Sequence, residues 1–196
     1  MRYDASHKEE TRKRILASAS QTIRLKGPDG VGVAKLMSEA GLTHGGFYAH
    51  FKSKEDLVAQ TITEMFEGIH AHLTKTLASG TPSQGLRLYI DLYLGREHRD
   101  HPETGCPMAA LSGDVARMDA PGKQAFGRGL AQMHQTIAAH LEQIEPRPAD
   151  APSLAKSLTS EMAGALAMAR ASFDDEQAES ILASSRRAVK DRVGLS

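Results

Sequence analysis

The sequence predicts an all-α fold. In every convincing segment the apolar side chains recur three or four residues apart, and no stretch alternates apolar and polar residues long enough to form a strand. Aromatic residues make up only 5% of the chain and tryptophan is absent, so the core must be built from Leu, Ile, Met and Ala, which favour helices. A chain of 196 residues can form one sizeable core, or a small domain fused to a larger one.

Two helices separated by a loop are predicted at the N-terminus. Ser6 and Glu9 form a capping box that starts the first helix, which stops at Gly27. The loop GPDGVG follows. A shorter helix then covers residues 33–40, with Gly41 in the position that commonly ends a helix.

Two further helices follow closely. Thr43 can cap a short one that extends to about Phe51, and Ser53 with Asp56 forms a second capping box. The long helix that starts there has a face of apolar residues at helical spacing: Val58, Ile62, Met65, Ile69 and Leu73.

Five more helices are predicted in the rest of the chain. The segments SGTPSQG, DHPETGCP and EPRPADAP are rich in turn-forming residues and separate some of them. The predicted helices cover about residues 86–98, 107–118, 121–144, 153–171 and 175–192. The chain should therefore contain about nine helices in total.

The charge is unevenly distributed along a chain whose net charge is zero. Residues 1–54 contain ten Lys and Arg against five Asp and Glu, a net charge of +5, and the remaining residues contain fourteen against nineteen, a net charge of −5. This asymmetry suggests an anionic partner for the N-terminal quarter. An ordinary solvated face is the alternative.

The two short helices around the segment AGLT form a helix-turn-helix, whose second helix enters the major groove in DNA-binding proteins. Gly45 and Gly46 weaken that second helix, but without a Cβ they allow its backbone to approach a duplex closely. Phe47 and Phe51, four residues apart, can anchor it to the core. The alternative is a Gly-Gly turn beside ordinary core aromatics.

The run GVAKLMSEAGLTHGGFYAHFKSKEDL resembles the N-terminal signature of the TetR family of bacterial transcription repressors. An apolar-rich helix, an Ala-Gly turn, a small or polar cap, a tyrosine, a His-Phe pair and a K-x-x-L motif occur in the family's order. The resemblance covers roughly residues 8–60, and the remainder matches only in helix number and length. Gly32 departs from the family's usual Ser or Thr, which calls one phosphate contact into question.

The resemblance implies an N-terminal three-helix bundle with the helix-turn-helix, residues 1–53, and a larger α-helical ligand-binding and dimerisation domain, residues 54–196. The expected function is a ligand-responsive regulator, a repressor that binds a palindromic double-stranded DNA operator as a homodimer. A small-molecule or redox inducer of unknown identity would release it. A DNA-binding protein without ligand control is a further possibility. The candidate DNA-binding residues are Lys35, Thr43, His44, Gly45, Tyr48, His50 and Lys54, with His44 the best candidate for base reading.

The candidate ligand-binding residues lie on helices that line the cavity in such repressors: Met65, Phe66, Tyr89, Tyr93, Cys106, Met108, Phe126, Met133 and His134. Most of them could equally belong to the core. Cys106 precedes Pro107 and is therefore expected at a helix N-cap, where the helix terminus would lower the pKa of its thiol. This predicts a sensor of oxidants or electrophiles, with a buried, inert cysteine as the alternative.

The last two helices are expected to form the homodimer interface as a four-helix bundle. The segment SEMAGALAMARAS is rich in small residues, and apolar residues follow one edge of each helix. The apolar residues are Leu154, Leu158, Met162, Leu166, Ile181, Leu182, Ala188 and Val189. The alternative is that they complete the core of the monomer.

The rival class is a small metal-binding helical enzyme. The segment EHRDH places His98 and His101 three residues apart, within reach of one metal ion. No second pair supports such a site, and the motifs HExxH, GxSxG and a Gly-rich phosphate loop are absent, so neither an enzyme nor a cofactor is expected. The charged N-terminus and the short apolar runs predict a cytoplasmic protein without a membrane partner.

Overall fold

The computed structural model describes the backbone of residues 2–195 and, within this range, the side chains of all residues except 2–7 and 44. This part of the chain contains nine α-helices, three short 3-10 helices and no strand, so the all-α prediction is confirmed. The elements are α1 (Arg2–Lys26), η1 (Pro28–Gly30), α2 (Val33–Glu39), η2 (His44–Ala49), α3 (Lys54–Leu77), α4 (Pro82–Tyr93), α5 (Arg96–Asp100), η3 (Pro102–Thr104), α6 (Pro107–Val115), α7 (Ala120–Leu141), α8 (Ala151–Ala171) and α9 (Asp175–Arg192).

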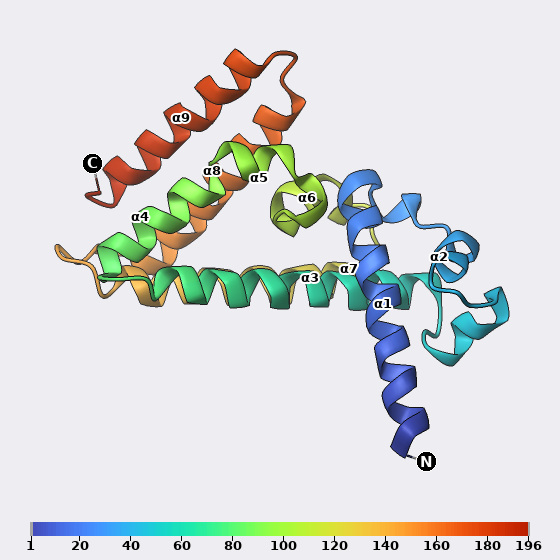
Figure 1. Cartoon of the computed structure of the whole chain (residues 1–196). Helices are drawn as coiled ribbons and strands as arrows, with labels where there is room; N and C mark the ends of the chain where they lie inside the picture. Colours follow the sequence, from blue (N-terminus) through green and yellow to red (C-terminus); the bar gives the residue numbers. More distant parts are fainter. Residues whose placement is uncertain (1, 196) are drawn as a thin grey trace.

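The helices are arranged around a long pair, α3 and α7, which lie side by side (Figure 1). Helix α1 crosses this pair near the start of α3, and α2 with η2 lies beyond it at the same end of the molecule. Helices α4 and α8 pack on the other end, and α9 packs on both of them. Helix α6 contacts α1, α3, α7 and α8 and so lies where the two ends of the protein meet.

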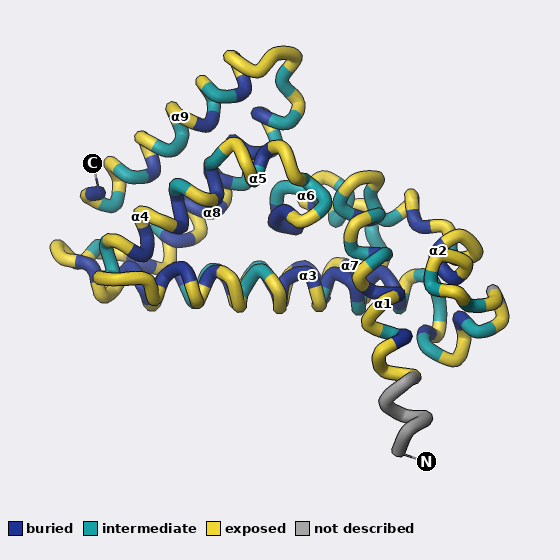
Figure 2. Tube along the Cα trace, viewed as in Figure 1, coloured by how far each residue is buried: buried dark blue, intermediate teal, exposed yellow. Residues whose placement is uncertain are grey.

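Figure 2 shows that buried residues follow the facing sides of these helices, whereas α9 exposes much of its surface. The apolar stripe predicted for α3 is largely inside: Val58, Ile62, Met65 and Leu73 are buried, and Ile69 is partly buried against the core. No helix among the described residues combines the length and the apolar character that crossing a bilayer requires.

Side-chain caps define where several helices begin. The Ser53 hydroxyl accepts a hydrogen bond from the Asp56 N–H (3.2 Å), as the second capping box predicts, although the Asp56 carboxylate accepts from Lys52 N (2.8 Å) instead of reaching back to Ser53. Thr81 and Gln84 form a complete capping box at α4. Asp residues cap α7, α8 and α9.

Three predicted boundaries are wrong. Helix α1 begins at Arg2, before the proposed cap at Ser6, whose side chain lies outside the described residues. Thr43 makes no capping hydrogen bond, and the segment after it is a 3-10 helix because two glycines weaken the α-helical alternative. The helix predicted over residues 86–98 is two helices, since the chain turns at Gly95 between α4 and α5.

Candidate nucleic-acid interface and ligand pocket

The helix-turn-helix consists of α2, a tight turn and η2. Gly41 has a φ of +73°, and the Gly41 and Leu42 N–H groups donate to the carbonyls of Ser38 (3.0 Å) and Met37 (2.8 Å), which is the Schellman pattern. Residues other than glycine rarely adopt this φ. The turn at Gly41 therefore sets the orientation of η2 relative to α2.

Phe47 and Phe51 hold η2 against the core, as predicted. Both side chains are 2% exposed, and their ring centroids lie 5.6 Å apart. Tyr48 lies between them in sequence but is 68% exposed, with its ring edge-on to Phe47. A Cβ added to Gly45 would meet nothing within 4 Å, so packing inside the protein does not require a glycine there.

The remaining candidate DNA-binding residues lie at the same end of the molecule. Lys35 is largely exposed beside Glu39 (3.8 Å), whereas Lys54 is partly buried and its Nζ donates to the Asp29 carbonyl (3.4 Å). Thr43 is also exposed, and the His44 side chain lies outside the described residues. At the start of α2, Gly32 provides no capping side chain.

His50 differs from the other candidates because its Nδ1 is buried without a hydrogen-bond partner among the described residues. Burial, together with the nearby charges of Lys8 and Arg12, lowers the pKa of His50, so the ring is neutral at physiological pH. Arg12 also contacts the Gln60 side chain and lies 5.8 Å from the centre of the Phe51 ring. Arg12 thus ties α1 to the start of α3.

A pocket of about 850 Å³ opens between α1, α3, α4 and the segment that leads into α6. Four of the predicted ligand residues line it: Met65, Tyr89, Tyr93 and Cys106. The other five do not. Phe66 and Phe126 meet edge-on with centroids 5.3 Å apart, His134 contacts the Thr159 hydroxyl (2.9 Å), and Met108 and Met133 are buried in the core.

Sequence reasoning missed the wall that α1 contributes to this pocket. The residues concerned recur at helical spacing: Lys13, Leu16, Ala17, Ser20 and Arg24. This spacing is visible in the sequence, but it resembles the flank of an ordinary core stripe. Only the crossing of α1 over the body of the protein turns that flank into a pocket wall.

Hydrogen bonds fix the loop that carries Cys106 at the inner end of the pocket. His98 Nδ1 lies 2.7 Å from the Tyr93 carbonyl and Nε2 lies 3.0 Å from the Cys106 backbone nitrogen. Since the backbone N–H donates to Nε2, the ring proton is on Nδ1 and donates to the carbonyl. From α1, Arg24 Nε donates to the Gly105 carbonyl (2.7 Å).

Cys106 occupies the N-cap of α6, as predicted, but its side chain is only 1% exposed. Burial raises the pKa of the thiol. The Tyr93 hydroxyl, the N–H groups of Met108 and Ala109 and the charge of Arg24 act in the opposite direction without reversing the shift. The expected lowering of this pKa is therefore wrong, because desolvation outweighs the helix terminus.

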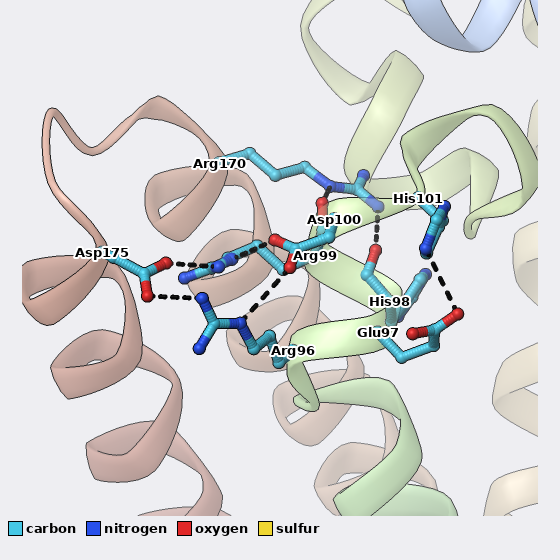
Figure 3. Close-up of polar contacts among 8 residues, drawn as sticks. All are labelled: Arg96, Glu97, His98, Arg99, Asp100, His101, Arg170 and Asp175. Carbon is cyan, nitrogen blue, oxygen red and sulfur yellow. Dashed lines mark hydrogen bonds and ion pairs between the residues drawn. The ribbon is translucent and has the colours of Figure 1, made fainter.

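Helix α5 is bound to α8 and α9 by arginine side chains (Figure 3). Arg96 and Arg99 each contact one oxygen of the Asp175 carboxylate at 2.5 Å. From α8, Arg170 donates to the carbonyls of His98 (2.5 Å) and Arg99 (3.2 Å). These contacts hold α5, which contributes Glu97 and His98 to the pocket wall, against α8 and α9.

The same contacts leave no support for a metal site in the segment EHRDH. Both ring nitrogens of His98 are engaged, and His101 lies between Glu97 (3.3 Å) and Glu103 (3.2 Å). Among the described residues, no group of three or more His, Cys, Asp or Glu side chains could hold a metal ion.

His98 should make folding sensitive to mild acid. Burial lowers its pKa from 6.5 to about 4. Between these values the unfolded chain binds a proton that the native state excludes, so the stabilisation is complete above pH 6.5 and is lost as the pH falls towards 4. From pH 7 to pH 5 we expect a loss of about 2 kcal/mol in the free energy of unfolding.

Urea unfolding of the wild type and His98→Gln at both pH values measures this loss. The variant should show a loss smaller by about 2 kcal/mol than that of the wild type. His101→Gln, which alters an exposed histidine of the same segment, is the control and should behave like the wild type. Equal losses in wild type and His98→Gln would contradict the prediction.

Comparisons with known proteins agree with this architecture. Residues 15–61 match the family model of bacterial regulatory proteins, tetR family, and residues 82–183 match the model of the LmrA/YxaF-like transcriptional regulator C-terminal domain. The HTH-type transcriptional repressor NemR of Escherichia coli K12 is 26% identical over 135 residues, 68% of each chain. The HTH-type transcriptional regulator LmrA of Bacillus subtilis is 25% identical over 118 residues, 59% of this chain and 63% of LmrA.

Solved structures show the same fold. The reduced form of E. coli NemR superimposes with a TM-score of 0.79 at 24% identity, covering 91% of this chain and 96% of NemR. A TetR-family regulator of Agrobacterium tumefaciens gives a TM-score of 0.80 at 20% identity, covering 94% and 98%. The relatives are transcriptional regulators and not enzymes, so the metal-enzyme alternative is unsupported. With one family model on the helix-turn-helix and a second on more than half of the chain, the protein is a ligand-responsive transcriptional regulator of the TetR family.

Proposed function

We propose that this protein is a repressor that binds a palindromic operator as a homodimer and leaves it when a small molecule occupies the pocket beside Cys106. TetR-family regulators bind DNA and small-molecule ligands, typically as dimers. The observation that carries the proposal is the position of α1. This helix packs against the helix-turn-helix on one side and forms a wall of the pocket on the other, so a ligand touches the DNA-binding unit directly.

The DNA-binding unit is proposed to comprise residues 1–53, and residues 54–196 form the ligand-binding and dimerisation unit. Of the exposed candidates, Gly45 and Tyr48 lie on η2, Thr43 directly precedes it and Lys35 lies on α2; η2 would enter the major groove. Lys54 begins α3, whose first N–H groups offer a phosphate site. The pocket is lined by α1 from the first unit and by α3 from the second, so a ligand would contact both proposed units.

The dimer is proposed to form through the exposed sides of α8 and α9, here called the α8–α9 face. The apolar edge expected to make this contact is mostly inside the protomer: Leu158, Met162, Leu166, Leu182 and Val189 are buried, and Leu154 and Ile181 pack against the core. The α8–α9 face contains Met168 on α8 and Arg187 on α9, both exposed, and otherwise consists mainly of small residues: Ser157, Ser160, Gly164 and Ala171 on α8 and Ser180, Ala183, Ser184 and Ala188 on α9. Small side chains let two copies of these helices approach closely.

A covalent inducer acting on Cys106 is the second candidate. Its thiolate would attack a peroxide, forming a sulfur–oxygen bond and breaking the oxygen–oxygen bond with release of water or hydroxide. Arg24, Tyr93 and the first N–H groups of α6 surround the sulfur and would stabilise the resulting sulfenate. The raised pKa of the thiol favours the non-covalent inducer. Release of the wild type but not of Cys106→Ser by peroxide, with recovery in reductant, would favour the covalent one.

Lys54→Ala tests the DNA interface. The substitution should lower operator affinity about fivefold and non-operator affinity by a similar factor, because a phosphate contact carries no sequence information. It should also reduce the slope of log affinity against log salt concentration by about one for each protomer. Electrophoretic shifts of upstream DNA over a salt series measure both quantities.

Arg117→Ala is the control for this experiment because Arg117 is exposed in the turn after α6 and, among the described residues, forms an ion pair with Asp114 alone (2.7 Å). It should leave affinity and salt slope unchanged. Failure of the wild type to shift any upstream region at low salt would overturn the proposed function. An unchanged salt slope in Lys54→Ala would remove Lys54 from the interface.

A further inference from the structure

The inner end of the pocket contains two phenol hydroxyls that are buried and unused. Tyr89 and Tyr93 are each 5% exposed, and neither hydroxyl bonds to a nitrogen or oxygen atom of the described residues. The Tyr93 hydroxyl has only the Cys106 sulfur, a weak acceptor, beside it in this part of the chain. Burial raises the pKa of both phenols well above their usual range, so both remain protonated and able to donate. A buried hydroxyl without a partner is unfavourable, and a ligand that accepts from it relieves that cost.

A cation lies in the same wall. Arg24 is half-buried, with Nε donating to the Gly105 carbonyl and Nη1 to Ser20. Among the described residues no carboxylate pairs with this guanidinium, and Nη2 has no partner. Burial accordingly lowers the pKa of Arg24. The acids of the pocket lie towards solvent: Glu64 is exposed, and Glu97 and Glu103 both contact His101.

The rest of the lining suits a flat apolar body. The rings of Tyr89 and Tyr93 lie 5.8 Å apart, and that of Tyr93 meets His98 edge-on at 4.8 Å. Aliphatic side chains from three helices complete the walls: Leu16 from α1, Met65 and Ile69 from α3, and Leu92 from α4. A volume of about 850 Å³ accommodates a molecule of one to three fused rings.

We propose that the pocket binds a planar aromatic carboxylate, whose oxygens accept hydrogen bonds from Arg24 and from the Tyr89 and Tyr93 hydroxyls. This inference rests on the proposed function in taking the pocket as the inducer site. A carboxylate has lone pairs for all three donors, and its plane matches the fork of a guanidinium. A neutral amide of the same shape offers one acceptor oxygen and no charge.

The proposed ligand contacts also link the pocket to the DNA-binding unit. Arg24 lies on α1, whereas the two tyrosines lie on α4. A carboxylate bound by all three therefore bridges the helix that supports the helix-turn-helix and the body of the protein. It also competes with the Gly105 carbonyl for Arg24, so α1 gains a second set of contacts that only the ligand-bound state has.

Calorimetric titration of the DNA-free protein with 2-naphthoate and its neutral isostere 2-naphthamide tests the ligand class. We expect 2-naphthoate to bind at least tenfold more tightly. Tyr93→Phe and Tyr89→Phe should each weaken 2-naphthoate binding about fivefold while leaving thermal stability close to or above that of the wild type. The Tyr89 hydroxyl has no partner among the described residues, and the Tyr93 hydroxyl has only the weakly accepting Cys106 sulfur. Arg24→Gln should weaken it further and abolish the preference over 2-naphthamide.

Arg186→Gln is the matched control, because Arg186 is also partly buried and donates to a backbone carbonyl, that of Leu94 (2.7 Å), but lies outside the pocket. The Arg186→Gln variant should bind 2-naphthoate with the affinity of the wild type. Equal affinity for 2-naphthoate and 2-naphthamide, or tyrosine variants that bind like the wild type, would overturn the inference.

Electrophoretic shifts of operator DNA with 2-naphthoate test the proposed function separately. Binding in the calorimeter with release from DNA supports both ideas. Binding with the expected variant pattern but no release supports the ligand class and contradicts the inducer role of the pocket. Release of DNA with no preference for 2-naphthoate over 2-naphthamide contradicts the ligand class alone.

Discussion

Gly164→Glu is expected to convert the dimer into a folded monomer that has lost its operator affinity. Gly164 lies in the middle of the exposed side of α8, and a Cβ placed there would meet nothing within 4 Å in the protomer. Glutamate also favours a helix over glycine by roughly 1 kcal/mol. The protomer should therefore be at least as stable as in the wild type.

The dimer should not tolerate the same change. In a four-helix bundle across the α8–α9 face, two carboxylates would be placed between closely packed small residues, where they displace the partner helix and lose their hydration. A monomer presents one recognition element instead of two, which should lower operator affinity by about 10²-fold or more. Sedimentation velocity measures the oligomeric state, urea unfolding the stability of the protomer and electrophoretic shifts the operator affinity.

Leu166→Glu, two residues further along α8, is the contrasting control. Leu166 is fully buried in the protomer, so its replacement should unfold the protein instead of releasing a monomer. If Gly164→Glu still sediments as a dimer, the α8–α9 face is not the interface. If Leu166→Glu gives a stable monomer, the assignment of Leu166 to the core of the protomer is wrong.

This contrast shows why the proposed dimer contact is harder to predict than the helices that would carry it. The helical spacing of apolar residues in α8 and α9 is a local property of the sequence, and α9 was predicted with its observed bounds. Apolar periodicity shows that Leu158, Met162 and Leu166 are buried, but not whether the same chain or a second copy buries them. Small residues such as Ser160 and Gly164 carry almost no hydrophobic signal, and their exposure in the protomer had to come from the structure.

The two candidate sites also differ in how far the sequence predicts them. The helix-turn-helix was predictable because the Gly41 turn and the Phe47–Phe51 anchor are determined by residues close in sequence. The pocket was not, because Arg24 and Gly105 are 81 residues apart and meet only when α1 crosses the body. Cys106 shows both effects. Its N-cap position was predicted from Pro107, but its raised pKa results from burial by distant helices.

Gly129→Ala is expected to destabilise the protein by about 2–3 kcal/mol, which is the usual range for overpacking a core. An alanine Cβ at this position would lie 2.1 Å from Phe66 Cγ and within 2.6 Å of two further ring carbons. The ring has little room to move, because Phe66 is 2% exposed and also meets Phe126 edge-on. Helices α3 and α7 would have to separate at this contact.

Gly127→Ala provides the matched control on the same helix. Gly127 is exposed, and a Cβ there would meet nothing within 4 Å, so alanine should stabilise α7 by up to about 1 kcal/mol. Urea unfolding of both variants separates the helix propensity of alanine from the clash. Adding Phe66→Leu to Gly129→Ala should recover part of the loss, since leucine leaves room for the new methyl group. Similar stabilities for Gly127→Ala and Gly129→Ala would show that α3 and α7 can move apart at little cost. The contact between Phe66 and Gly129 would then not set the distance between α3 and α7, the long pair around which the other helices are arranged.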